Sequence, residues 1–430
     1  MSQTFKTYAL FGMVAVLIVL TGVFQSWDYA LKLVAMGLVS AIMALGVNLQ
    51  WGIAGLFNVG VMGFVALGGV AVVLTSVAPV PEAWSAGGPR ALFALILGAV
   101  VMACAVVVYQ RTRRAWALLA VLVVGFVIYR WMRDDAVAAI EAVNPAATGF
   151  LGGLGLPVVL AWPVGGLLAA GAAWVIGKTA LGLRSDYLAI ATLGISEIII
   201  AVMKNEEWLT RGVKNVNGLP RPMPYEIDLQ NDPAFVAKAA DWGLDAVSAS
   251  TLYVKLGYVG LFAAVLIILL VLAQMALNSP WGRMMRAIRD NEVSARAMGK
   301  DVTFRHLQVF VLGSAICGIA GAMMTTLDGL LQPTAYQPLR YTFLIWVMVI
   351  VGGSGNNLGA VLGGILIWFL WIQVETLGPV LMVWATAALP EGSALKAHLL
   401  GSVQHMRLLT MGVILLLVLR FSPRGLLPER

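Results

Sequence analysis

A few polar side chains stand inside long apolar stretches of the sequence, where they could bind a polar ligand. They are Asn48, Asn58, Thr192, Ser196 and Glu197. A carboxylate in apolar surroundings is costly unless it is paired, so Glu197 is a candidate ion or substrate ligand, although near the end of its helix it could simply meet water or Lys204. Asn48 and Asn58 could instead hydrogen-bond neighbouring helices, the commoner role. We predict Asn48, Asn58, Thr192 and Glu197 as candidates for a pore or substrate path.

Glycines crowd a second region that could expose backbone groups to a ligand. Gly352, Gly353 and Gly355 are able to break a helix and turn its backbone toward a cavity. The alternative is close helix packing, since Gly359 and Gly363 fit the small-xxx-small pattern of helix contacts in lipid. We add Gly353 and Gly355 to the candidate substrate path.

The residue types needed for catalysis or metal binding are sparse. The three histidines are not at metal-ligand spacing, and no Ser-His-Asp or paired-carboxylate set shares one depth in the apolar segments. Cys104 and Cys317 lie inside apolar runs and are typical of small buried residues. We therefore expect no catalytic residue, no metal and no cofactor, so the chain is not expected to be an enzyme.

The elements that position these residues are predicted to be membrane-spanning helices. The chain is 60% hydrophobic and only 11% charged, too apolar to cover a water-soluble fold of 430 residues. Continuous apolar runs without strand alternation indicate helices. We expect a single all-α transmembrane bundle over residues 1–430, with about 10–12 spans. The runs lie near Tyr8–Phe24, Tyr29–Leu49, Leu56–Val77, Ala91–Tyr109, Ala115–Trp131, Val159–Ile176, Tyr187–Met203, Leu252–Leu277, His306–Leu327, Tyr341–Val351, Leu358–Val374 and Leu408–Leu419. The short run Tyr341–Val351 could be re-entrant.

Basic residues are concentrated in every second connection between the apolar runs, and this distribution sets the orientation of the chain. One set carries most of the lysines and arginines, while the connection 205–251 balances its basic residues with seven carboxylates. By the positive-inside rule, both termini and the connection 278–305 are cytoplasmic and 205–251 is extracytoplasmic. The net charge of +7 then reflects topology, and we expect contact with membrane lipid and not with nucleic acid.

The stretch Trp281–Phe310 is a basic, helix-prone island between two apolar runs. Met284, Met285 and Ile288 recur at helical spacing, Asp290 or Asn291 can cap a second short helix, and Gly299 can end it. An ordinary basic connector would explain the charge alone, but not the small residues on one side of the second helix, which would let a partner protein approach closely. The candidates for such contact are Arg283, Arg286, Arg289, Asp290, Glu292, Ala295 and Gly299.

Several blocks of the chain resemble one known family. Together with Trp281–Phe310, they resemble the permeases of ABC transporters that import branched-chain amino acids, and the form Leu-Arg-x-Asp-Tyr-Leu-Ala-Ile is similar to the second of two paralogous permease subunits. The blocks are Ala44–Phe64, Leu181–Ile199, Leu209–Pro220, Phe343–Gly364 and Arg420–Pro428. Three features depart from the family pattern. The hydrophobic pair 91–131 is extra relative to the usual plan, and Gly68-Gly69-Val70 stands where the family commonly has Gly-Ala-Tyr. Arg211 and Val213 flank Gly212, where the family usually has paired glycines and a proline.

The resemblance implies a transport subunit of a bacterial inner membrane. It implies pairing with a paralogous permease, cytoplasmic ATPase subunits that grip 278–305 and hydrolyse ATP, and an extracytoplasmic solute-binding protein. The implied substrate is a branched-chain or other hydrophobic amino acid, although relatives in the same family import urea and short amides. From a different class, a secondary transporter working alone on an ion gradient is the alternative, and Glu197 would be its ion site.

Overall fold

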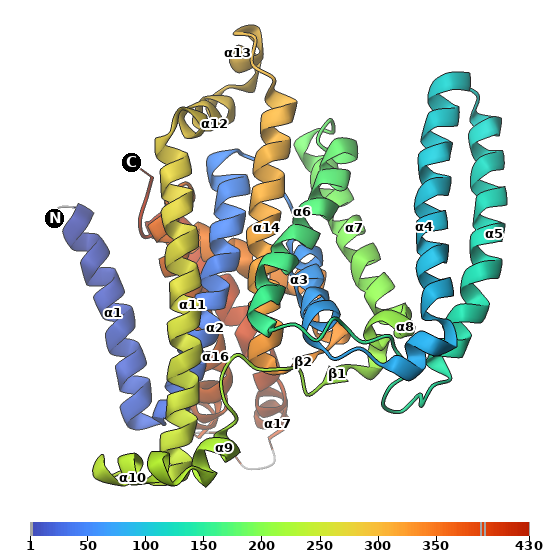
Figure 1. Ribbon diagram of the computed structural model, residues 1–430. Helices are drawn as coiled ribbons and strands as arrows, with labels where there is room; N and C mark the ends of the chain where they lie inside the picture. The colour runs from blue at the N-terminus through green and yellow to red at the C-terminus, as the bar shows by residue number, and fades with distance from the viewer. Residues whose placement is uncertain (1–2, 388, 391–392, 430) are drawn as a thin grey trace.

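The computed structural model describes residues 3–387, 389–390 and 393–429, and helices dominate it (Figure 1). Two short strands, β1 (Val216–Asn217) and β2 (Leu330–Leu331), pair antiparallel. The first half contains α1 (Gln3–Phe24), α2 (Trp27–Val47), the π-helix η1 (Asn48–Ile53), α3 (Val61–Ser76), α4 (Pro81–Thr112), α5 (Ala115–Glu141), η2 (Val158–Leu160), α6 (Ala161–Ala180), α7 (Ser185–Asn205), α8 (Glu207–Thr210) and η3 (Gly212–Lys214). The second half contains α9 (Glu226–Asn231), α10 (Pro233–Asp241), α11 (Ala246–Asn278), α12 (Pro280–Asp290), α13 (Glu292–Ala297), α14 (Val302–Asp328), η4 (Pro333–Ala335), α15 (Pro338–Gly352), α16 (Asn357–Ala385), α17 (Ala394–Gly401), η5 (Val403–His405) and α18 (Met406–Phe421).

The all-α polytopic architecture expected from hydropathy is confirmed. In the described part of the chain, nine helices are long and apolar enough to cross a membrane, or ten if the bent pair α17 and α18 forms one span. The apolar helices α3 and α15 are shorter. Nine of the twelve predicted apolar runs fall within one helix, including the short run Tyr341–Val351, which belongs to the 15-residue α15. The runs Tyr29–Leu49 and Val159–Ile176 extend into η1 and η2, and Leu56–Val77 begins before α3.

Local sequence signals set the starts of several helices. Ser26 accepts a hydrogen bond from the Tyr29 amide at the start of α2, and Asp245 accepts one from Ser248 at the start of α11. Asp301 caps α14, and Asn356 caps α16 through the amides of Leu358 and Gly359. These short polar side chains satisfy backbone donors that the first helical turn leaves free.

Small residues let the central helices α2, α3, α14 and α16 approach one another closely. A Cβ atom added to Gly68 of α3 would lie 1.9 Å from the Gly318 carbonyl oxygen of α14, and one added to Gly321 would lie 1.9 Å from the Val65 oxygen. On the other side, Gly364 of α16 faces the backbone of Ala41 in α2 in the same way. Glycine at these positions is therefore a packing requirement, as expected where helices associate without a hydrophobic driving force.

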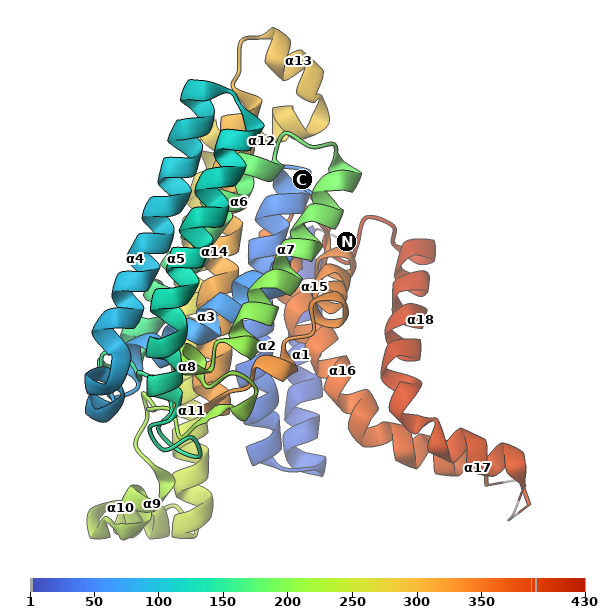
Figure 2. The ribbon, with the colours of Figure 1, turned by 90° about the vertical axis from the view of Figure 1, so that its right-hand side faces the viewer.

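Helices α4 and α5 form a hairpin that stands at the edge of the molecule (Figures 1 and 2). Its lower end is fastened by a small apolar cluster that includes Ile140, Leu151 and Trp208, and by an ion pair between Arg133 and Glu206. Most of its large apolar side chains above this point are exposed. The predicted extra pair 91–131 lies in this hairpin.

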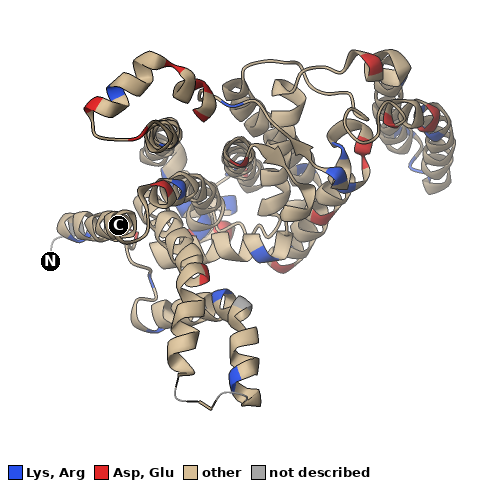
Figure 3. Cartoon of the chain, turned by 90° about the horizontal axis from the view of Figure 1, so that it is seen from below, with Lys and Arg blue, Asp and Glu red and all other residues tan. Residues whose placement is uncertain are grey.

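The two ends of the molecule differ in their connections. Helices α12 and α13, the α4–α5 turn and the α6–α7 turn lie at one end, and both chain ends lie in that half of the molecule (Figures 1 and 2). The segment 205–251, with α9 and α10, covers the opposite end, where acidic residues are prominent (Figure 3). The arrangement places the basic connections together, as the positive-inside argument requires.

Candidate functional site

Helix α12 is amphipathic and lies against the bundle by its apolar face. Pro280 occupies its first turn, where a missing amide hydrogen is harmless. Met285 and Ile288 are completely buried, and the Trp281 indole donates to Gln308 of α14 at 3.1 Å. The predicted helix, with its apolar spacing, is therefore present and firmly seated.

Helix α13 is a short capped helix that projects from the end of the molecule (Figure 2). Asn291, one of the two predicted caps, accepts a hydrogen bond from the Ser294 amide at 2.9 Å. Glu292 pairs with Arg296 at 2.6 Å, one turn along the helix. Gly299 follows with φ of +75° and open space around it, so it ends the segment in a left-handed turn, as predicted.

The exposed side of α13 is more apolar than the sequence interpretation assumed. Val293 and Met298 are each 79% exposed, which is unusual for apolar side chains in a basic connection. Ala295, by contrast, is partly buried against the core and does not form an open small-residue face. Of the three small residues expected on one side of this helix, Ala297 and Gly299 are exposed and accessible to a partner.

Arg289 connects α12 to two distant parts of the chain. Its Nη1 donates to the Gly52 carbonyl oxygen in η1 and to Oε2 of Glu429, the latter at 2.7 Å. Burial alone would lower the pKa of this guanidinium, but the hydrogen bond and charge of Glu429 raise the pKa overall. Arg289 therefore stays charged and ties the loop, the π-helix and the chain end together.

The π-helix η1, which contains Gly52, contacts the glycine break between α15 and α16. Helix α15 ends at Gly352, and Gly353 and Gly355 adopt φ angles of +119° and +85°, which side chains with a Cβ rarely adopt. The Asn48 side chain accepts from the Gly355 amide at 2.8 Å and donates to Asn357 at 3.0 Å. Both interpretations of these glycines apply, since the helix breaks after Gly352 and a Cβ atom on Gly352 would lie 2.0 Å from the Gly359 carbonyl oxygen. Asn48, the partner of the break, was an independent candidate.

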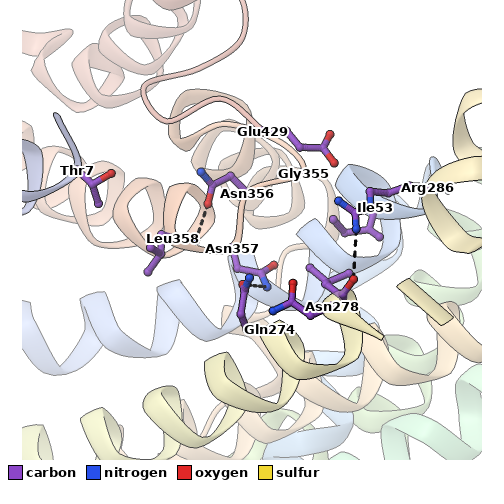
Figure 4. Close-up of a pocket in the computed structure, with 11 residues that line it drawn as sticks. Thr7, Ile53, Gln274, Asn278, Arg286, Gly355, Asn356, Asn357, Leu358 and Glu429 are labelled. Carbon is purple, nitrogen blue, oxygen red and sulfur yellow. Dashed lines mark hydrogen bonds between the residues drawn. The ribbon is translucent and has the colours of Figure 1, made fainter. Parts of the chain in front are cut away.

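A cavity of about 410 Å³ lies beside this break, between α11, α12 and α16 (Figure 4). Gln274 and Asn357 meet in it through a hydrogen bond of 3.3 Å. Gly355 and Arg286 line it as well, and Arg286 donates to the Leu277 oxygen at 3.3 Å. The cavity thus combines polar groups from the α12 region with the exposed backbone of the helix break.

Asn58 and Thr192 belong to a second buried polar chain. Asn58 donates to Gln50 at 2.9 Å, and Gln50 donates to Ser314 and to the Phe310 oxygen in α14. The Thr192 hydroxyl of α7 accepts from the Val59 amide at 3.1 Å. These side chains already have partners within the chain, which is the helix-fastening role that buried amides commonly have.

Glu197 lies apart from both polar chains. Its side chain is exposed and lines a shallow hollow together with Lys204 and Arg340. It forms no ion pair within 4 Å in the described part of the chain. The charged candidates Arg283 and Asp290 are exposed on the outer side of α12, where Asp290 pairs with Arg289 at 3.4 Å.

Sequence reasoning missed the partners that complete these contacts. Gln50, Gln274, Asn357 and Glu429 are all involved, and the two glutamines carried a usable signal as amides inside apolar runs. No group of three or more potential metal ligands occurs among the residues that the structure describes.

The helices and their polar break define a multi-pass membrane protein with a structured connection at one end. Residues 29–419 match the family described as branched-chain amino acid transport system / permease component, and the chain belongs to that family. It is thus a multi-pass membrane protein of a transport permease family.

Individual relatives agree with this assignment. The chain is 26% identical over 294 residues to the high-affinity branched-chain amino acid transport system permease protein LivM of Escherichia coli K12, a match that covers 67% of this chain and only 61% of that protein. It is 28% identical over 299 residues to the probable branched-chain amino acid transport permease protein LivM of Methanocaldococcus jannaschii, covering 69% and 74%. A shorter match, 26% over 119 residues, covers 26% of this chain and 33% of the fructose import permease protein FrcC of Rhizobium meliloti. No solved structure matches the chain.

Proposed function

We propose that this chain is a permease subunit of an ATP-driven importer of apolar amino acids in a bacterial inner membrane. Both termini and the α12–α13 connection face the cytoplasm, and 205–251 faces outward. The chain pairs with a paralogous permease, receives substrate from an extracytoplasmic binding protein, and is driven by separate cytoplasmic ATPase subunits. Family membership and the names of the relatives support the transport role.

The contact of Arg289 with Gly52 and Glu429 is the observation that carries the coupling mechanism. Helix α13 presents Val293 and Met298 as an apolar contact for an ATPase groove, while α12 transmits its movement because Met285 and Ile288 hold it rigidly. Displacement of α12 acts through Arg289 on the π-helix, and through Asn48 on the Gly355 break. π-Helical turns are often placed where a helix must change during function.

A transporter that works alone on an ion gradient receives no comparable support. Such a mechanism needs a charged group held in the membrane interior. Glu197 was the candidate, and its exposed position in the hollow with Lys204 gives it an ordinary polar environment.

The test is co-expression of the tagged chain with its neighbouring ATPase and permease genes, followed by purification and ATP-dependent uptake in liposomes. In the variant Val293→Asp/Met298→Asp, we expect loss of ATPase co-purification without loss of membrane insertion. The matched control is Ile227→Asp, an exposed apolar residue of α9 at the opposite end, which should leave ATPase co-purification unchanged. Uptake that proceeds without any ATPase would overturn the proposal.

A further inference from the structure

Residues 422–429 follow α18 and form a strap across the glycine break between α15 and α16. The strap turns at Gly425, whose φ of +78° lies in the left-handed region. Ser422 closes this turn, because its hydroxyl donates to the Gly425 carbonyl oxygen at 2.7 Å and its own carbonyl oxygen accepts from the Gly425 amide at 2.8 Å. A Cβ atom on Gly425 would lie 2.4 Å from the Cα atom of Gly353, so the strap and the break are in backbone contact.

The first half of the strap is bonded to the end of α15. The Leu426 amide donates to the Val351 carbonyl oxygen at 2.8 Å. The Leu427 amide donates to the Gly352 carbonyl oxygen at 2.9 Å. Both carbonyl groups belong to the last turn of α15, where a helix leaves its acceptors without intrahelical partners. The strap therefore satisfies backbone groups that the glycine break would otherwise leave unpaired.

The side chain of Leu427 anchors the strap in a small apolar cluster. It is 1% exposed and packs with Val14 of α1 and with Leu362 and Leu366 of α16. Withdrawal of Leu427 would expose this apolar side chain and leave the bonded carbonyl groups of α15 unpaired, and both changes are unfavourable. This half of the strap is therefore expected to stay in place when the protein changes conformation.

The second half of the strap, Pro428 and Glu429, is held more weakly. The Pro428 carbonyl oxygen accepts from the Asn356 side chain at 3.3 Å. Oε2 of Glu429 accepts from Nη1 of Arg289 at 2.7 Å, and the two side chains are 26% and 25% exposed. A partly solvated ion pair adds little stability, because water competes for each partner. The strap thus has an anchored half and a half that can be released at small cost.

The releasable half borders the cavity of about 410 Å³ beside the break (Figure 4). Glu429 lines this cavity together with Gly355 and Asn356, and a Cβ atom on Gly355 would lie 2.6 Å from Oε2 of Glu429. The same Arg289 nitrogen that holds Glu429 also donates to the Gly52 carbonyl oxygen of the π-helix. Because one guanidinium nitrogen fixes both the strap and the π-helix, a displacement of α12 must change both contacts.

We infer that the strap is a two-part clamp on the glycine break, in which Leu427 is the fixed anchor and the Arg289–Glu429 ion pair is the release point. While the pair is intact, Pro428 and Glu429 hold the break in its present geometry. When α12 is displaced, Arg289 withdraws, Glu429 leaves the cavity, and the backbone around Gly355 is free to rearrange. Glu429 is thus a positioning residue that acts through Arg289. The part of this release in transport rests on the proposed function, but the clamp itself can be tested on the chain alone.

The clamp is tested first by thiol labelling of the full chain in lipid nanodiscs. Cys104→Ala removes the exposed native thiol, Cys317 is buried, and Pro428→Cys places a reporter on the releasable half. We expect Glu429→Gln to speed maleimide labelling of this reporter several-fold, because the ion pair that holds the strap is lost. Glu429→Asp should restore slow labelling in part. Asp186→Asn, an exposed carboxylate at the start of α7 at the same end of the molecule, is the matched control and should change nothing.

Reversible cross-linking tests whether release is needed for transport. The variant Arg289→Cys/Glu429→Cys, also carrying Cys104→Ala, is assembled with the ATPase subunits and treated with a reducible bis-methanethiosulfonate. We expect the cross-linked protein to lose its uptake, and reduction to restore the uptake of the untreated double variant. The comparison is made within one protein, so the loss of the arginine itself cancels. The same treatment of Arg130→Cys/Asp134→Cys, an ion pair of the hairpin, should leave uptake unchanged.

Two results would overturn the inference, once thermal unfolding has shown that each variant is folded. One is unchanged labelling of the reporter in Glu429→Gln. The other is equal uptake by the cross-linked and the reduced double variant, which would make the strap a static brace and leave the proposed function intact. Failure of the proposed function gives a different pattern, in which no ATPase co-purifies but labelling of the reporter still depends on Glu429.

Discussion

The central helices and the α4–α5 hairpin are similarly apolar, but they differ sharply in burial. The most apolar window of the α2 span has a mean hydropathy of 2.1 and is 78% buried, and the corresponding window of α14 has values of 1.9 and 67%. The windows of α4 and α5 have hydropathies of 2.9 and 1.9, yet they are only 17% and 6% buried. Hydropathy therefore identifies a helix that can enter lipid, but it does not identify which helices form the core.

Small residues and buried amides account for the difference. Gly68 and Gly321 permit backbone contact between α3 and α14, while Asn48 and Gln50 bridge α2 to its neighbours. The upper hairpin has a close contact at a glycine only between its own two helices, where Gly125 faces Val101, and it presents branched and aromatic side chains outward. In lipid, where apolar surface alone does not drive association, close packing and hydrogen bonds decide which helices come together.

The largest effect on stability should come from a substitution that obstructs the glycine contact between α3 and α14. Gly68→Ala places a methyl group 1.9 Å from the Gly318 oxygen, and a backbone atom cannot move aside cheaply. We expect the free energy of unfolding to fall by about 1–3 kcal/mol and the yield of folded protein to be lower. Gly98→Ala in the hairpin meets only Tyr129, at 3.4 Å, and is the matched control. Thermal unfolding in detergent measures the stability of both variants. Equal losses of stability in Gly68→Ala and Gly98→Ala would show that the core and the hairpin do not differ in this respect.

Removal of a buried amide should come next. Asn48→Ala leaves the Gly355 amide and the Asn357 side chain without their present partner, which we expect to cost about 1–3 kcal/mol. Uptake should fall further than stability alone explains, since the glycine break loses its fixed geometry. Thr112→Ala, which removes an exposed hydroxyl from the end of α4, should change neither measurement. A folded Asn48→Ala protein with normal uptake would show that the Asn48 contact is dispensable.

Much of this fold was predictable, because apolar runs and capping residues are local signals. The runs predicted the helices, the spacing of Met285 and Ile288 predicted the buried face of α12, and Asn291 was a predicted cap. The candidate site was predictable only in part. Asn48, Gly355 and Arg289 were named separately, but nothing in the sequence indicated that they meet.

Non-local geometry explains what sequence reasoning missed. Glu429 lies 140 residues from Arg289, and Asn357 lies 83 residues from Gln274. An apolar helix can also rotate about its axis without changing its hydropathy. For this reason the sequence left two alternatives open for Glu197, a buried ligand or contact with water and Lys204, and the structure shows the second.

A smaller and more selective effect is expected for Arg289→Gln. The variant loses its charged bond to Glu429 and weakens the contact with Gly52, so ATP hydrolysis should continue while uptake falls several-fold. Stability should change little, because Arg289 is partly solvated. Arg130→Gln is the control within the hairpin, where Arg130 forms an exposed ion pair with Asp134 that is worth little. Uptake and ATPase rates measured on the same liposomes distinguish loss of coupling from loss of assembly.

The smallest effect on the core is expected from deletion of 91–131, with a short linker joining its ends. The deletion removes two crossings together, so the orientation of every later helix is unchanged. It also retains Ala83, Ile140 and Trp208, most of the apolar cluster that fastens the hairpin. Because so little of the deleted segment is buried, the remaining bundle should unfold within a few degrees of the full chain in a thermal unfolding measurement. If the shortened chain aggregates or unfolds at a much lower temperature, the hairpin contributes to the core through a contact with another subunit. Its low burial in the isolated chain then reflects a missing partner instead of a peripheral role.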